Sequence, residues 1–341
     1  MLARSLLVLC ITCLAACSRP LPQPKSGQVK SAGLTGKASA SEYSGAVESA
    51  RKKARAFDYR KTDALSIRRQ KISSVANLVT EKFTVEINDP LRKIGTFEQK
   101  YLFYHCPGNE PRPTVVLLTL FGDEILLDRL TARSFCRKGF NVLIVIPTQV
   151  HGETDRPFDQ VNDVFTRNII TARMGIDLLE QLPETDPERL FTYGTSMGGI
   201  RGAMLFGAEP RLKRAGVITG GGDIPGIVAA SKYGTLQGIR EARMAAENIP
   251  DITSLRAYLE NILTVDPLDF ACLREPEDIA FVISTNDDYV GTDFQEQLYD
   301  AFSRPRDGRY PGAIYVKTDH ILTGIRIREW TSSFAKFFHA Y

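Results

Sequence analysis

The feature that most constrains the fold is a serine set among glycines at residues 194–199, which read Gly-Thr-Ser-Met-Gly-Gly. Residues 189–193 before it are typical of a buried strand, and residues 200–205 after it are typical of the first turns of a helix. A Gly-x-Ser-x-Gly sequence at such a corner is typical of a sharp, strained turn whose neighbouring side chains must be tiny. We therefore expect Ser196 to stand exposed at the end of a strand. The alternative is a glycine-rich loop with an incidental serine.

Strand-like and helix-like segments alternate along the chain. Strands are expected at residues 78–87, 97–105, 114–119, 141–146, 189–193, 214–219, 279–284 and 313–316, and helices at residues 48–59, 127–138 and 164–182. A turn at Asp89-Pro90 separates the first two strands, which favours an antiparallel pair. The later strands are continuous apolar runs separated by helices. This pattern is typical of a mainly parallel sheet with helices on both faces.

The expected architecture is an α/β domain at residues 45–341 built on an eight-stranded, mainly parallel sheet. Residues 226–266 are too long for one crossover helix, and we interpret them as a small helical cap over the sheet. The 341 residues of the chain suffice for one large domain with tails. Its 43 Lys and Arg residues barely exceed its 40 Asp and Glu residues, and no dense basic run occurs, so we expect no nucleic-acid partner.

A short leader precedes this domain. Residues 6–13 are apolar but too few to span a bilayer as an ordinary transmembrane helix. Residues 14–17, Leu-Ala-Ala-Cys, resemble the lipobox of bacterial lipoproteins, in which a signal peptide (here residues 1–16) is removed and the cysteine is lipidated. The resemblance implies that Cys17 is the lipidated residue, and that Ser18 directs the chain to the outer membrane, facing the periplasm. The alternative is a conventional signal peptide with an incidental Cys17.

Residues 17–44 are rich in Pro, Gly, Ser, Lys and Ala and predict a flexible tether between the lipid and the domain. Three cysteines lie beyond the leader, namely Cys106, Cys136 and Cys272. An oxidising compartment permits one disulfide among them, and the odd number leaves at least one thiol free. The sequence does not choose the pair.

The order of the expected elements, with the Ser196 corner after the fifth strand, resembles the α/β-hydrolase fold over roughly residues 83–341. The segment His-Gly-Glu-Thr at residues 151–154 resembles the frequent His-Gly-Glu-Ser of that family. One departure is that Thr119-Leu120 stand where the family usually has His-Gly. The resemblance implies a serine hydrolase whose nucleophile is Ser196.

A serine hydroxyl needs a histidine to take its proton and a carboxylate to hold that histidine in the right tautomer. In this fold the chain order is Ser, then Asp or Glu, then His. Of the four histidines, His105 and His151 precede the serine, and His339 lies within the last amphipathic helix. His320 directly follows the last expected strand, where the family places its base. We therefore expect His320 to be the base.

Three aspartates are candidates for the acid. Asp287 follows the strand at residues 279–284, and its spacing to Val290 fits the Asp-x-x-Val that the family shows at this corner. Asp288, one residue later, is an alternative. Asp223, after the preceding strand, is a second alternative because some relatives carry the acid there.

The oxyanion that forms during acyl transfer needs two backbone N–H groups. One is expected from Met197, at a helix N-terminus, and the other from Phe121, with Asp123 as the fallback. A carboxylate at Asp123 would oppose the developing charge, so Phe121 is preferred. No metal-binding spacing occurs, and the glycines at 220–222 are not followed by Gly-Lys-Ser/Thr, so no metal or cofactor is expected.

These residues predict a serine hydrolase that cleaves carboxylic esters through an acyl-enzyme on Ser196. A first alternative keeps the mechanism but makes the substrate an amide, as in a peptidase of related fold. A second alternative is a lipid-anchored binding protein that retains the fold without turnover.

Overall fold

The structure is a computed structural model of the chain, and it describes residues 40–75, 78–108, 110–120, 125–147 and 157–341. The leader with Cys17, the motif at residues 151–154, Phe121 and Asp123 lie outside the described residues. Helix α2 begins the described part at Ala40–Ala54, so the last residues of the expected tether are helical. Across the described ranges, no helix combines the length and apolar character that crossing a membrane requires.

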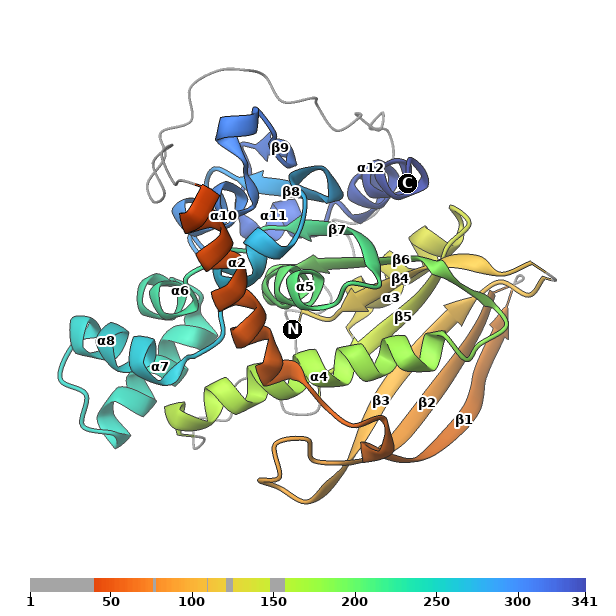
Figure 1. Cartoon of the computed structure of the whole chain (residues 1–341), viewed down its shortest axis with the longest axis horizontal. Helices are drawn as coiled ribbons and strands as arrows, with labels where there is room; N and C mark the ends of the chain where they lie inside the picture. The colour runs from red at the N-terminus through yellow and green to blue at the C-terminus, as the bar shows by residue number, and fades with distance from the viewer. Residues whose placement is uncertain (1–39, 76–77, 109, 121–124, 148–156) are drawn as a thin grey trace, which may run out of the picture.

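A single sheet runs through the described part of the chain in the order β1-β2-β3-β5-β4-β6-β7-β8-β9 (Figure 1). The strands are β1 (Ala64–Val75), β2 (Leu78–Asn88), β3 (Thr96–His105), β4 (Arg112–Leu118), β5 (Asn141–Ile146), β6 (Thr185–Thr195), β7 (Leu212–Ile218), β8 (Ile279–Ser284) and β9 (Gly312–Val316). Strands β1, β2, β3 and β5 pair antiparallel in that order. From β5 through β4 to β9 every pairing is parallel. The expected antiparallel start and mainly parallel sheet are confirmed.

The expectation of eight strands was wrong, because the described residues form nine and the sequence pattern missed β1. This strand lies at the sheet edge, where Leu65 and Ile67 are about half exposed. Its register with β2 shifts between Lys71 and Ser73, so Ile72 does not follow the alternation of apolar and polar residues that Leu65 and Ile67 begin. An edge strand with exposed apolar residues and a bulge lacks the periodic signal that identifies a strand in a sequence.

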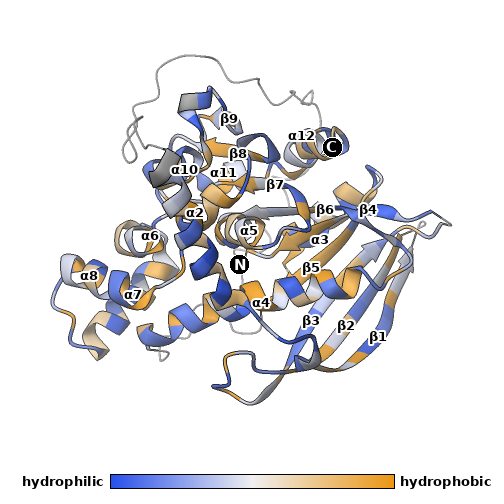
Figure 2. Ribbon diagram, viewed as in Figure 1, coloured by the Kyte–Doolittle hydropathy of each residue, from blue (hydrophilic) through white to orange (hydrophobic). Residues whose placement is uncertain are grey.

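Helices cover both faces of the sheet. Helices α4 (Val161–Leu179), α5 (Met197–Ala208) and α10 (Thr292–Phe302) contribute to one apolar core, and α4 and α5 lie in front of the sheet in Figure 1. Helices α3 (Leu126–Cys136) and α12 (Ile327–His339) pack on the opposite face in a second core, which includes Phe135 and Trp330. Because both faces are covered, strands such as β5 and β8 are buried along their whole length and consist mostly of apolar residues (Figure 2).

The segment expected to form a cap is helical. It contains α6 (Ile224–Ala230), α7 (Gly234–Ala246) and α8 (Ile252–Ile262), which precede the short α9 (Pro267–Phe270). Leu255 and Leu259 of α8 pack with Phe158 in a small apolar cluster separate from the two main cores. The role of this segment as a cap stays a prediction.

Candidate active site

Ser196 occupies the sharp turn between β6 and α5. Its backbone has φ 56° and ψ −123°, a conformation that is strained for a residue with a side chain. A Cβ at Gly194 would collide with the backbone of Gly198, and a Cβ at Gly198 would collide with the carbonyl oxygen of Leu118 in β4. The glycines therefore let α5 approach the ends of β6 and β4 by direct backbone contact, as the sequence pattern predicts.

Three segments far apart in the chain meet at this turn. The parallel strands β6, β8 and β9 end at the same edge of the sheet, and Ser196, Asp287 and His320 follow them in that order. His320 begins the short helix α11 (His320–Gly324). Its Nε2 lies 2.8 Å from Ser196 Oγ, and its Nδ1 lies 2.6 Å from Asp287 Oδ2. The structure thus brings together the three residues that the sequence analysis singled out first.

Asp287 is held as a buried carboxylate. Its side chain is fully buried, and Oδ1 accepts hydrogen bonds from the backbone N–H groups of Tyr289 (2.8 Å) and Val290 (3.0 Å). Burial by itself would raise the pKa of Asp287, but the bond and charge of His320 and these N–H groups lower it below its ordinary value. A charged Asp287 accepts from Nδ1–H of His320, which leaves Nε2 free to accept the Ser196 proton.

Gln295 supports Asp287 and was missed in the sequence. Its Nε2 donates to Asp287 Oδ2 at 2.8 Å, and its Oε1 accepts from the N–H of Ser284 at 3.0 Å. Gln295 is fully buried in α10, on the face that also buries Leu298 and Phe302. The sequence did carry one signal for this role, namely a glutamine on the apolar face of an amphipathic helix. A buried polar side chain needs hydrogen-bond partners, so such a residue is a candidate for supporting a buried site.

The alternative acids lie elsewhere. Asp288 is 65 % exposed at its side chain and pairs with Lys232 Nζ at 3.2 Å. Asp223 accepts from the N–H of Gly226 at the start of α6 (3.0 Å) and pairs with Arg256 at 2.7 Å. The structure brings neither carboxylate into hydrogen-bond contact with His320.

An aromatic contact links the expected cap segment to His320. The ring of Tyr289 lies 5.2 Å from the imidazole ring of His320, measured between centroids, and the ring of Tyr233 lies 5.0 Å from that of Tyr289. Tyr233 belongs to the turn between α6 and α7. The segment at residues 226–266 therefore reaches the neighbourhood of the base through one intervening ring.

Met197, expected to donate to the oxyanion, is the first residue of α5. Backbone N–H groups at a helix N-terminus favour an anion, both by hydrogen bonding and through the helix dipole. The expected second donor, Phe121, and the fallback, Asp123, lie outside the described residues.

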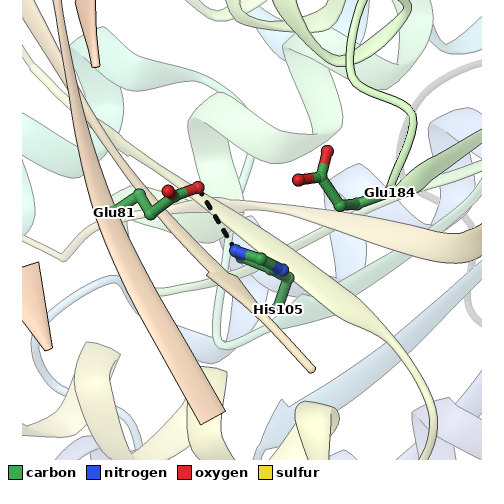
Figure 3. A group of neighbouring side chains, drawn as sticks. All are labelled: Glu81, His105 and Glu184. Carbon is green, nitrogen blue, oxygen red and sulfur yellow. Dashed lines mark hydrogen bonds and ion pairs between the residues drawn. The ribbon is translucent and has the colours of Figure 1, made fainter. Parts of the chain in front are cut away.

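A second cluster of ionisable groups lies at the opposite end of β6. Figure 3 shows Glu81, His105 and Glu184, whose potential metal-ligating atoms all lie within 4.8 Å of one another. His105 Nε2 lies 3.2 Å from Glu81 Oε2. The Arg69 guanidinium contacts Glu81 Oε2 at 2.5 Å and Glu184 Oε1 at 2.8 Å. Because Arg69 already supplies positive charge to both carboxylates, we assign this cluster to an ion-pair network and place no metal there.

The three cysteines beyond the leader carry free thiols. Cys136 is buried in α3, whereas Cys106 and Cys272 are partly exposed. Burial raises the pKa of the Cys136 thiol, so this thiol is a poor nucleophile. The structure favours no disulfide pair among these cysteines.

The chain is similar to known proteins in its three-dimensional structure. No family model matches it, and no curated protein matches it. An acetyl xylan esterase from Paenibacillus sp. R4 is 13 % identical, with a TM-score of 0.63 over 85 % of this chain and 93 % of that chain. A glucuronoyl esterase from Teredinibacter turnerae is 13 % identical, with a TM-score of 0.54 over 94 % and 88 %. A puromycin-hydrolyzing peptidase from Mycobacterium tuberculosis is 15 % identical, with a TM-score of 0.56 over 79 % and 40 %. The sheet order, the covering helices and these likenesses give the chain the α/β-hydrolase fold.

Proposed function

We propose that the protein is a serine hydrolase that cleaves carboxylic esters through an acyl-enzyme on Ser196. The observation that carries this proposal is the unbroken hydrogen-bonded chain from Ser196 Oγ through His320 to Asp287. The strained backbone at Ser196 supports the same conclusion, since such strain concentrates at functional sites.

Each residue has a defined role in the proposed reaction. Ser196 Oγ attacks the ester carbonyl carbon while His320 Nε2 takes its proton, and Asp287 stabilises the imidazolium that forms. The N–H of Met197 and a second N–H, expected from Phe121, stabilise the oxyanion. The imidazolium then protonates the departing alcohol. A water molecule, activated by His320 in the same way, releases the acid and restores Ser196.

The choice of an ester over an amide rests on two supports. The alcohol of an ester leaves more readily than an amine, so the Ser–His–Asp arrangement by itself suffices for ester cleavage. Two of the structural neighbours reported above are esterases. The peptidase neighbour shares the fold, but this chain spans only 40 % of it. Amide hydrolysis is therefore the alternative outcome of the test below.

The test combines a fluorophosphonate probe with two substrate panels. The wild-type protein should be labelled, and Ser196→Ala should be unlabelled and should lose about 10⁶-fold in turnover. Ser332→Ala on the exposed face of α12 is the matched control and should behave as wild type. Ester substrates of increasing acyl length are compared with aminopeptidase substrates on the same preparations. Folded wild-type protein that resists the probe would instead support a binding protein without turnover.

A further inference from the structure

Arg201 is a buried guanidinium beside the Ser196 turn that the proposed mechanism does not use. It is the fifth residue of α5, and only 2 % of it is exposed. Burial lowers the pKa of Arg201 to about 10, and the nearby carboxylate of Asp128 opposes that shift. Arg201 therefore stays charged at neutral pH. A buried charge is costly unless its donors are satisfied, so its contacts indicate what it holds in place.

Those contacts join two segments next to the proposed nucleophile. Arg201 Nη2 donates to the carbonyl oxygen of Thr119, directly after β4, and Nε donates to that of Met197 at 3.3 Å. The same two segments already touch by backbone, because Gly198 lies against the carbonyl groups of Leu118 and Thr119. The guanidinium thus ties the end of β4 to the first turn of α5.

A further contact extends this arrangement to the start of α3. Asp128, the carboxylate that opposes the pKa shift of Arg201, accepts a hydrogen bond from the N–H of Ile125 at 2.9 Å. Arg201 therefore contacts the end of β4 directly, and its neighbour Asp128 binds the backbone at the start of α3.

We propose that Arg201 is a positioning residue that fixes the first turn of α5, with the Met197 N–H that is expected to stabilise the oxyanion, against the end of β4. This inference rests on the proposed function. Oxyanion donors act only within a narrow distance of the developing charge, about 2.7–3.1 Å, so a small shift of the first turn of α5 relative to β4 weakens the stabilisation. An arginine suits this position because its planar fork reaches two carbonyl groups at once, whereas a lysine presents a single ammonium group.

The test compares Arg201→Met and Arg201→Lys with wild type. Methionine fills similar space without a charge, so it keeps the core packed. Arg274→Met is the matched control, because Arg274 donates to the carbonyl oxygen of Leu212 at the opposite end of the sheet. The fraction of folded protein is measured by circular dichroism for every variant, and kcat is expressed per folded molecule.

We expect kcat of Arg201→Met to fall about tenfold to hundredfold with KM nearly unchanged, and Arg201→Lys to fall less. Affinity for a trifluoromethyl ketone, which binds serine hydrolases through a tetrahedral oxyanion, should fall by the same factor as kcat/KM. Arg274→Met should keep both kcat and this affinity. A merely structural role for Arg201 would lower thermal stability and leave the ketone affinity per folded molecule unchanged.

The outcomes separate this inference from the proposed function. If wild type reacts with the fluorophosphonate probe but the folded Arg201 variants keep wild-type kcat and ketone affinity, the positioning role is wrong and the serine hydrolase stands. If folded wild type does not react at all, both proposals fail. Should Arg201→Met not fold, the ketone affinity of Arg201→Lys decides, because an unchanged affinity there overturns the positioning role.

Discussion

Asp287 and Asp288 adjoin in the sequence but lie in opposite environments. The side chain of Asp287 is fully buried against His320, whereas that of Asp288 is 65 % exposed beside Lys232. Adjacent residues on a turn point in different directions, so a shift of one residue separates a buried carboxylate with fixed donors from a solvated one. The two residues therefore provide a natural pair for testing the role of the acid.

Asp287→Asn should lower kcat by about 10⁴-fold, because an amide favours the wrong tautomer of His320. Asp288→Asn is the matched control and should stay within about twofold of wild type, since a surface ion pair contributes little. Steady-state kinetics on both variants at neutral pH checks this. A large loss in Asp288→Asn with normal activity in Asp287→Asn would transfer the role to Asp288.

The catalytic candidates could be predicted from the sequence, because the fold fixes their order along the chain and their positions after strands. Residues whose role depends only on their contacts in the folded protein could not be predicted. Ser196, His320 and Asp287 stood out because strand ends, chain order and the spacing to Val290 restrict the choices. Arg201 gave no comparable signal, since its partners are backbone carbonyl groups, which every residue possesses. Gln295 gave only a weak one.

At the scale of elements, the turn between β2 and β3 does more than reverse the chain. Asp89, 1 % exposed, accepts from the backbone N–H groups of Lys93 (2.8 Å) and Ile94 (3.0 Å) within the turn. Its other oxygen accepts from Arg167 Nε of α4 at 2.9 Å. The turn is thereby fixed to the helix that covers the sheet. An Asp-Pro pair predicts the turn itself but not this long-range contact.

This contact gives a pH-dependent prediction. Burial by itself would raise the pKa of Asp89, but Arg167 and the two backbone N–H groups lower it to about 2. Because the folded-state pKa lies below the unfolded value, the unfolded chain takes up the proton first as the pH falls. The stabilisation is therefore complete above about pH 4 and is lost as the pH falls toward 2.

Asp89→Asn should cost about 2 kcal/mol of unfolding free energy at pH 7, and the difference from wild type should shrink below pH 4. Urea denaturation at pH 7 and at pH 3 measures both values. Asp163→Asn, which removes a partly exposed ion pair with Lys93, is the control and should cost at most about 1 kcal/mol. A pH-independent difference for Asp89→Asn would contradict the assigned charge.

At the scale of the whole molecule, the sequence predicts the sheet and its covering helices, but not where the additional segments lie against them. Long apolar strands separated by helices require burial on both faces, so the α/β architecture follows from the pattern alone. The placement of residues 226–266 does not, because it depends on long-range contacts such as that of Tyr233 with Tyr289. The edge strand β1 could not be predicted for the same reason, because it is defined by its pairing with β2 and not by a buried apolar face.

At the same scale, we propose that the protein begins with a lipoprotein leader and that Cys17 carries a lipid that holds the domain at a bacterial outer membrane. Several acyl chains on one residue bury enough CH₂ groups for stable anchoring, whereas a single chain gives only reversible binding. Expressed in bacteria, wild type should sediment with membranes and incorporate labelled palmitate, and Cys17→Ser should do neither. Cys13→Ser, within the apolar part of the same leader, is the control and should behave as wild type. Palmitate-free Cys17→Ser that still sediments with membranes would show that something other than this lipid anchors the protein.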